Sequence, residues 1–481
     1  MLAEASADDV GPELMARVAL LAGRAFALNH RYSAALSVLF QTAEQVMDSD
    51  PLAALDMLCT CAVVAYHSGS EASREQVRQV LSAITATGPL GVRRAWTLAM
   101  IDPVADRTAL LPELPRLAEA ARGRPEELVA VATVAWLLDE TPLALELFDD
   151  GLGRWRARGP VPEGFVCAAW SAYFEQGQWG MADDLARQAS ARTAVADLPE
   201  AAASALGMRA SILAVRGETA AARELATEAL TLIDPDKHTM LGVRSRWALG
   251  TAALADGDHN TAFECFRAMF TVHGEPAHYH ASYPALADLA ATAARIGRHD
   301  DAATALAAAE HALAGNPSPR LTALLHHGRA LVAAEQDNAE HHYLASLGVP
   351  SAHRWPFERA KVLLDHGEWL RRRRRIVEAR PQLTAALEVF RRLGARPWAD
   401  RAQAELRAAG VGIAGSAPDP LDGLTAQQQQ IIRLAARGLT NREIGERMFL
   451  SPRTVTSHLY RSFPKLGVTS RSQLRDLLAR W

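Results

Sequence analysis

Residues 212–230, ILAVRGETAAARELATEAL, contain the pattern that decides the fold. One apolar, helix-like run stops at Gly217, and a second run begins directly after it. The same arrangement surrounds Gly177, Gly257 and Gly297, so the pattern repeats every 40 residues. Glycine permits the turn between two antiparallel helices, and small residues after it let those helices pack closely. The repeat therefore predicts stacked helical hairpins.

The second helix of each repeat carries small or apolar residues at three fixed positions. Five, nine and twelve residues after each glycine come Ala182, Ala222, Ala262 and Ala302, then Ala186, Ala226, Phe266 and Leu306, then Ala189, Ala229, Met269 and Ala309. Fainter copies place Ala35, Ala144 and Ala379 in the first of these roles. The order resembles the tetratricopeptide repeat, with longer helices than that family's 34-residue unit provides. We expect six to nine hairpins in a TPR-like α-solenoid.

Three regions follow from the patterning along the chain. Helical periodicity extends from about residue 16 to 410, and no alternating run indicates a strand, so the chain is expected to be all-α. Residues 411–423 are rich in Gly, Pro and Ala and break the periodicity, which predicts a linker. The predicted organisation is a helical repeat array over 1–410, a linker over 411–423 and a separate domain over 424–481.

Charge is distributed unevenly between these regions. Residues 422–481 hold ten Arg or Lys against four acids, a net charge of +6, whereas the whole chain of 481 residues has −4. The remainder therefore carries −10. A small basic module on an acidic body fits an anionic partner that docks at one end.

The last sixty residues contain four short helix signals, each with its own start device. Thr425 and Gln428, Thr440 and Glu443, and Ser470 and Gln473 form capping-box patterns, and Ser451 precedes a proline at a first helical position. Gly438 stands where the first helix should stop. The middle two helices are joined by the short turn Phe449–Ser451, which is helix-turn-helix spacing.

The third of these helices has two faces of different chemistry. On a helical wheel, Leu459, Ser462, Phe463 and Leu466 cluster on the side that should pack on Ile432, Leu434 and Ile444. The opposite side carries Arg453, Thr456, Ser457, Tyr460 and Arg461. Arginines, small hydroxyls and one tyrosine suit the major groove of DNA, because donors reach phosphates and base edges there.

The C-terminal domain resembles the DNA-binding domain of LuxR-type bacterial regulators. The matching residues include Gly438, Leu439, Thr440, Asn441, Glu443, Ile444, Ser451, Pro452, Thr454, Val455, His458, Lys465, Leu466, Gly467, Val468, Ser470 and Arg471. The resemblance implies base reading by Thr456, Ser457, Tyr460 and Arg461. It implies phosphate or positioning contacts for Thr440, Asn441, Arg442, Arg453, Thr454, His458, Lys465 and Arg471.

Two residues depart from the family's pattern. Gln428 stands where the family usually has Glu, and glutamine can close the capping box without adding negative charge at the helix start. Pro464 is expected to kink or end the recognition helix, because proline lacks a backbone N–H.

Residues 355–410 also resemble the segment that precedes this domain in large ATP-dependent LuxR regulators of the MalT-like kind. Those regulators carry an NTPase module, but this chain contains no GxxxxGK[S/T] phosphate loop. ATP binding is therefore not expected, and no cofactor or metal is predicted.

Other features have ordinary explanations beside functional ones. Residues 371–375, five arginines, are interpreted as a solvated turn, with an auxiliary phosphate contact as the alternative. The histidine pairs 278/280, 326/327 and 341/342 lack the ligand spacing of a metal site. Cys59, Cys61, Cys167 and Cys265 lie in helix-like stretches and are expected to be reduced thiols packed in the core.

An apolar stripe on the last helix suggests how the protein assembles on DNA. Leu474, Leu477, Leu478 and Trp481 could form part of the core, but we favour a dimer contact. A homodimer would place two recognition helices about one DNA turn apart.

The leading hypothesis is a cytoplasmic transcription regulator that binds duplex DNA and no membrane. Its repeat array would receive a small-molecule, peptide or protein effector in a concave groove, and RNA polymerase is a further expected partner. The alternative is a scaffold or adaptor whose helix-turn-helix contacts protein. A third class, an enzyme, has no motif in its favour, so the chain is expected not to be one.

Overall fold

The computed structural model describes residues 11–28, 31–84, 90–156, 159, 161–196, 198–313, 315–333, 338–411, 421, 424–448 and 450–479. Within these ranges the regular secondary structure is helical, and Phe270 and Pro276 form an isolated bridge. The all-α fold class predicted from the sequence is confirmed.

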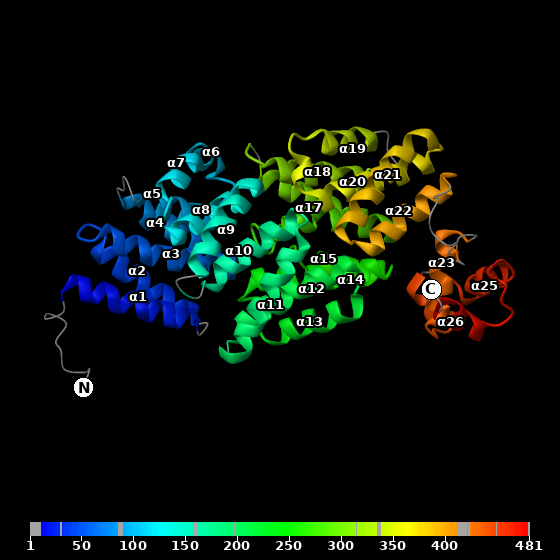
Figure 1. The fold of residues 1–481 in the computed structure, drawn as a ribbon, viewed down its shortest axis with the longest axis horizontal. Coiled ribbons are helices and arrows are strands. Elements are labelled where there is room, and N and C mark those ends of the chain that lie inside the picture. Colours follow the sequence, from blue (N-terminus) through cyan, green and yellow to red (C-terminus); the bar gives the residue numbers. More distant parts are fainter. Residues whose placement is uncertain are drawn as a thin grey trace.

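The helices form an array of packed pairs followed by a small bundle (Figure 1). The first part of the array holds α1 (Pro12–Leu28), α2 (Tyr32–Val46), α3 (Pro51–Ser68), α4 (Glu71–Ala83), α5 (Leu90–Ile101), α6 (Arg107–Leu110), η2 (Leu111–Glu113), α7 (Leu114–Ala120), α8 (Pro125–Leu137) and α9 (Thr141–Arg156). The middle holds α10 (Glu163–Glu175), α11 (Trp179–Ala196), α12 (Pro199–Arg216), α13 (Thr219–Thr231), α14 (Thr239–Ala255), α15 (His259–Arg267), η3 (Tyr283–Ala285), α16 (Leu286–Ile296) and α17 (His299–Ala312). The array ends with α18 (Pro319–Val332), α19 (Ala339–Gly348), η4 (Ala352–Arg354), α20 (Pro356–Arg372), α21 (Ile376–Leu393) and α22 (Arg396–Ala408), and the bundle holds α23 (Ala426–Ala436), α24 (Asn441–Met448), α25 (Pro452–Leu466) and α26 (Arg471–Ala479).

The predicted glycine turns connect the two helices of each pair. Gly177, Gly217, Gly257 and Gly297 have φ values of +79°, +83°, +77° and +76°. Residues that carry a Cβ adopt this left-handed backbone conformation only at an energetic cost. They lie between α10 and α11, α12 and α13, α14 and α15, and α16 and α17. The 40-residue period therefore marks TPR-like helical hairpins, as the sequence predicted.

The small and apolar residues after each glycine are the buried stripe of the second helix. Ala182, Ala222 and Ala262 are 0% exposed, and Ala302 is 1% exposed. The residues predicted at the two later positions of each repeat are also buried: Ala186, Ala226, Phe266 and Leu306, then Ala189, Ala229, Met269 and Ala309. Ala35, Ala144 and Ala379, the fainter copies, are 0% exposed too.

One repeat departs from the pattern. Helix α15 ends at Arg267, and residues 268–285 then form an irregular segment before α16. The segment packs against the first part of the array, where the His278 ring nitrogen Nε2 lies 2.6 Å from the Tyr66 carbonyl and the Tyr66 hydroxyl lies 3.0 Å from His280 Nδ1. The Thr239 hydroxyl also donates to the Ser68 carbonyl at 2.8 Å. Parts of the array more than 170 residues apart are thus joined.

The five-arginine turn is held by acids of neighbouring helices. Arg371 and Arg372 form the end of α20, and residues 373–375 lie between α20 and α21. Arg371 pairs with Glu405, and Arg375 pairs with Glu340 at 2.6 Å and with Glu378 at 2.5 Å. The turn was expected to be solvated, but two of its arginines are paired with acids of the array.

The histidine pairs and cysteines occupy ordinary packed positions. His278 and His327 are buried, and His327 lies 2.9 Å from Asp365. In the described ranges, no three His, Cys, Asp or Glu side chains gather as metal ligands would. All four cysteines are free thiols, and Cys61 and Cys167 are buried.

One described helix, α3, is long and apolar enough to cross a membrane by length and composition alone. Half of its residues are buried inside the protein, and α3 packs against α2 and α5. The core helix of a folded domain has the same properties.

Candidate nucleic-acid interface

The four helices of the C-terminal bundle begin at the predicted caps. Thr425 and Gln428 form a complete capping box, with Thr425 N–H to Gln428 Oε1 at 3.0 Å and the Gln428 N–H to Thr425 Oγ1 at 3.3 Å. Gln428 therefore closes the box in place of the family's Glu. The Ser451 hydroxyl accepts from the Thr454 N–H at 3.0 Å and caps α25. Because these bonds satisfy amides that the first turn leaves free, they fix where each helix starts.

Two further predicted start signals and one predicted stop signal lie in this bundle. The Thr440 N–H and hydroxyl donate to the Glu443 carboxylate at 2.6 and 2.8 Å, and these bonds lower the pKa of Glu443. Gly438 follows α23 with φ of +92°. At Ser470, the backbone N–H donates to Gln473 Oε1 at 3.2 Å, while the hydroxyl contacts that of Ser472 at 3.0 Å. Only the Gln473 half of the predicted box is therefore formed, and Gln473 Oε1 also accepts from the Thr469 N–H at 2.7 Å.

The inner face of α25 forms the core of the bundle. Val455 and Ser462 are 0% exposed, and Leu459 and Leu466 are buried as well. They belong to one core with Ile432, Leu434 and Ile444, and Phe463 packs at its edge. The inward-facing set expected from the helical wheel is confirmed. Leu421, assigned to the linker, is also part of this core and is 1% exposed, so the domain's packing begins before residue 424.

The residues expected to read bases share the outer face of α25. Thr456, Ser457, Tyr460 and Arg461 are all exposed, and the Tyr460 side chain is 80% exposed. The Tyr460 ring is therefore accessible to a partner. Figure 1 shows α25 on the side of the bundle that lies away from the array.

A chain of hydrogen bonds ties three helices together beside this face. The Arg471 guanidinium at the start of α26 donates to Asn441 Oδ1 at 2.5 Å and to the Leu439 carbonyl. The Asn441 amide donates in turn to the Thr456 hydroxyl at 3.0 Å, and that hydroxyl donates to the Pro452 carbonyl at 2.8 Å. Asn441, Thr456 and Arg471 therefore help to set the angle between α24, α25 and α26.

The other predicted phosphate or positioning residues surround the same face. Arg453, Arg442, Lys465 and Thr440 are exposed, and Thr454 and His458 are half-buried. Arg442 pairs with Glu446 at 3.0 Å, with both side chains largely in solvent. Such a surface pair is weak, so a phosphate can replace the carboxylate.

Pro464 does not end α25. The helix continues to Leu466, and Gly467 terminates it with φ of +66°. Proline removes only one N–H donor near the helix end, and the last turn is then closed by the Gly467 N–H bonding to the Pro464 carbonyl. Lys465 therefore stays on the recognition helix.

The structure describes two side chains of the stripe predicted as a dimer contact, Leu474 and Leu477. Leu474 is 0% exposed in the domain's own core, so it is not available to a second subunit in this conformation. Leu477 packs partly against that core. The Leu478 side chain and Trp481 lie outside the described residues.

The sequence did not reveal that the bundle contacts the array. The Gln430 side-chain amide on α23 donates to the Gly257 carbonyl at 2.8 Å, and Arg437 lies 3.7 Å from Asp256. Both partners belong to the turn between α14 and α15. A glutamine on a polar helix face looks the same whether it contacts water or protein, so no sequence signal marked it.

Comparison with known proteins identifies this domain. The family model for the luxR family of bacterial regulatory proteins matches residues 422–478. The spore germination protein GerE of Bacillus subtilis is 36% identical over 50 residues, which are 10% of this chain and 68% of GerE. The chain belongs to the luxR family of bacterial regulatory proteins. The match places α23 to α26 in the luxR-type DNA-binding domain.

Other luxR-type relatives match over the same region alone. The DNA-binding transcriptional activator DevR/DosR of Mycobacterium tuberculosis is 46% identical over 55 residues, 11% of this chain and 25% of that protein. An HTH-type transcriptional regulator of Mycobacterium bovis is 47% identical over 57 residues, 12% of this chain and 6% of that protein. This chain thus matches only a small part of the length of these relatives.

Solved helical-repeat structures resemble the chain at low sequence identity. A Rap protein complexed with competence and sporulation factor aligns with TM-score 0.44 and 14% identity, covering 79% of this chain and 98% of that one. The apo form of the quorum sensor NprR from B. thuringiensis aligns with TM-score 0.43 and 13% identity, covering 69% of this chain and 97% of that one.

Proposed function

We propose that this luxR-family chain is a cytoplasmic transcription regulator that binds specific duplex DNA sequences through α25. Its repeat array would control that binding by receiving an effector. The observation that carries the proposal is the outer face of α25, where Ser457, Tyr460 and Arg461 are exposed on a helix locked by its own cap and core.

The chemistry of this face suits insertion into the major groove. The Arg461 guanidinium can donate two hydrogen bonds to a guanine edge, and the Tyr460 ring can contact a thymine methyl group or a phosphate. Small hydroxyls at positions 456 and 457 allow the helix to approach the bases closely. Arg453 at the start of α25 and Lys465 near its end would contact phosphates on either side and fix the helix in register.

Assembly on DNA as a homodimer is part of the proposal. Leu477, Leu478 and Trp481 of α26 and the residues after it remain the proposed contact, without Leu474. Two α25 helices about one DNA turn apart would recognise a palindromic site. RNA polymerase is a further proposed partner of the bound regulator.

A salt titration of DNA binding tests the proposal. The full chain is mixed with labelled duplex DNA from upstream of its own operon, and binding is followed by fluorescence anisotropy from low to physiological salt. We expect log affinity to fall linearly with log salt, with a slope of about −0.9 for each phosphate contacted. Lys465→Gln should reduce the magnitude of that slope by about one.

Glu310→Gln, in the array's surface pair with Arg329, serves as the matched control and should leave the slope unchanged. Failure of the full chain to bind any duplex at low salt would contradict the proposal and favour the adaptor.

A further inference from the structure

A cavity of about 150 Å³ lies in the middle of the array, where its first part meets the later repeats. Its walls come from α3, α8, α10, α14, α16, α18 and α20, together with part of the 268–285 segment. A cavity of this size holds a group about as large as benzene, so the apolar side chain of a small ligand fits it. The cavity is therefore suited to a small molecule and not to a folded partner.

Aromatic side chains form one wall of the cavity. The Trp170 and Phe174 rings stack with centroids 4.9 Å apart, and the Phe174 and Trp179 rings stack at 5.9 Å. Trp247 meets Phe174 edge-on at 5.8 Å. Trp170 Nε1 is buried and has no hydrogen-bond partner in the described residues. This wall offers apolar surface and π-faces, which bind apolar groups and cations.

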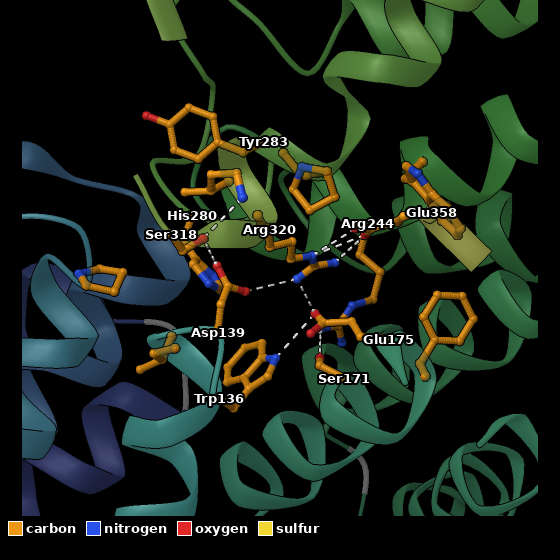
Figure 2. Close-up of a pocket in the computed structure, with 18 of the residues that line it drawn as sticks. Trp136, Asp139, Ser171, Glu175, Arg244, His280, Tyr283, Ser318, Arg320 and Glu358 are labelled. Carbon is orange, nitrogen blue, oxygen red and sulfur yellow. Dashed lines mark hydrogen bonds and ion pairs between the residues drawn. The ribbon is translucent and has the colours of Figure 1, made fainter. Parts of the chain in front are cut away.

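A second wall carries an excess of negative charge. Figure 2 shows Asp139, Glu175 and Glu358 converging on the single guanidinium of Arg320. Arg320 lies 3.4 Å from Asp139, 3.0 Å from Glu175 and 2.6 Å from Glu358, and its side chain is 7% exposed. Three carboxylates surround one cation, so one of them is available to a further positive group.

Glu175 is the carboxylate that has room for such a group. Its Oε1 faces Arg320 and accepts from Trp136 Nε1 at 3.3 Å, whereas its Oε2 is buried without a partner in the described residues. Burial raises the pKa of Glu175 to about 7, and Asp139 and Glu358 add to the increase while Arg320 opposes it. A buried oxygen without a donor is costly, and an ammonium group would satisfy it.

Asp139, which supplies one of these carboxylates, has an uncommon backbone conformation. Asp139 occupies the hairpin turn between α8 and α9 and has φ of +59°, where the four 40-residue repeats use glycine. Aspartate tolerates this conformation better than most residues do, because its short side chain can form local hydrogen bonds. Here the side chain accepts from the Ser318 hydroxyl at 2.5 Å and pairs with Arg320 inside the cavity.

Arg244 of α14 contacts α10 about one helical turn before Glu175. The Arg244 guanidinium lies 4.9 Å from the Trp170 ring centre, and it contacts Cys167 Sγ at 2.8 Å and the Ser171 hydroxyl at 3.3 Å. Among the described residues no carboxylate pairs with it. Ser171 and Glu175 are four residues apart on α10, so their Cβ atoms are about 6 Å apart on one helix face. A carboxylate bound at Arg244 would lie close to an ammonium bound at Glu175.

We propose that this cavity binds a small zwitterion, a free amino acid or a dipeptide, with its ammonium group at Glu175, its carboxylate at Arg244 and an apolar side chain against Trp170 and Phe174. The cavity joins the first part of the array to α18 and α20, so the bound molecule would fix how these parts sit together. Only its role as the effector rests on the function proposed above.

Binding to the full chain tests this assignment without DNA. The cavity wall contains four tryptophans, so their intrinsic fluorescence reports occupancy. The twenty L-amino acids and a set of apolar dipeptides are titrated, and each that binds is compared with its decarboxylated amine and its deaminated acid. We expect at least one amino acid or dipeptide to bind at least tenfold more tightly than either counterpart. The class that binds identifies the source of the ligand.

Two variants separate the ends of the site. Glu175→Gln keeps an oxygen for Trp136 and should weaken binding of the zwitterion and of its amine at least tenfold, while leaving the acid unchanged. Arg244→Gln should weaken the zwitterion and the acid and spare the amine. Glu310→Gln is the control for folding and should bind as the wild-type chain does.

Two results would overturn the assignment. One is that no amino acid or dipeptide changes the fluorescence at 10 mM, a concentration that detects dissociation constants in the millimolar range. The other is that the decarboxylated amine and the deaminated acid both bind to the wild-type chain as tightly as the zwitterion does. Either result leaves the DNA-binding proposal standing, because no DNA is present.

Discussion

The side chains of the two candidate sites are positioned in different ways: Tyr460 lies on the outer face of a single helix, α25, whereas Glu175 of α10 meets Arg320 of α18. Tyr460 and Arg461 could be placed on the outer face of α25 because helical periodicity alone separates them from Val455 and Leu459. Glu175 and Arg320 could not be singled out, because they resemble the other charged residues of an acidic helical array. Their special environment arises from packing between helices 145 residues apart in the chain.

The titration of Glu175 should make the stability of the folded chain depend on pH. Its pKa is raised from 4.5 to about 7 by burial, so between these values the folded chain holds a proton that the unfolded chain has lost. Folding stability from this group therefore falls as the pH rises through that window. Glu175→Gln removes the titration. Relative to the wild-type chain, the variant should gain about 3 kcal/mol of unfolding free energy between pH 4.5 and pH 8.

Urea unfolding of both chains at the two pH values measures this gain. Taking the difference between the chains cancels the titration of all other groups. An equal difference at pH 4.5 and pH 8 would show that Glu175 titrates as an exposed glutamate does.

At the scale of the element, caps and turns could be predicted because each depends on local chemistry. The glycine turns of the array and the caps at Thr425, Thr440 and Ser451 follow from a few neighbouring residues. The turn at Asp139 and the irregular segment 268–285 were not predicted, because tertiary contacts hold them. The continuation of α25 past Pro464 was not predicted either, although its stop signal, Gly467, is local.

The N-cap of α25 gives a prediction with a matched control on the same helix. Ser451→Ala removes the acceptor for the Thr454 N–H and should destabilise the start of α25 by about 1 kcal/mol. Hydrogen exchange of the α25 amides in the full chain should then accelerate about fivefold. Ser457→Ala, an exposed change within the helix, should leave exchange unchanged and alter only DNA binding. Equal exchange in the two variants would show that the cap does not hold the recognition helix.

Two hairpin glycines differ in what surrounds them. A Cβ at Gly217 would lie 2.8 Å from Pro397 Cγ, whereas a Cβ at Gly297 would meet nothing within 4 Å. Both have left-handed φ values, so Gly297→Ala should cost about 1 kcal/mol through the backbone alone. Gly217→Ala should cost more, because α22 must also move. The urea midpoints of unfolding of the two variants are compared. Equal decreases of the midpoint would mean that α22 can move away from Gly217 without a cost in stability.

At the scale of the whole molecule, the sequence predicted the order of the parts but not how they meet. The repeat period and the four caps gave an array followed by a small bundle. The contacts of Tyr66 with His280, of Asp139 with Arg320 and of Gln430 with Gly257 join residues 173 to 214 positions apart. No periodicity or spacing reports such pairs, and both the central cavity and the docking of the bundle depend on them.

If the outer face of α25 reads DNA bases, as we propose, the duplexes that the chain selects from a random library must depend on Arg461. The full chain, its Arg461→Ala variant and its Lys465→Ala variant are each used for selection, and the recovered duplexes are sequenced. We predict that the wild-type chain enriches a defined site and that Arg461→Ala changes the preferred base at one or two positions of it. Lys465→Ala should enrich the same site with weaker binding. Enrichment of the same site at wild-type affinity by Arg461→Ala, or of no site by the wild-type chain at low salt, would contradict the claim.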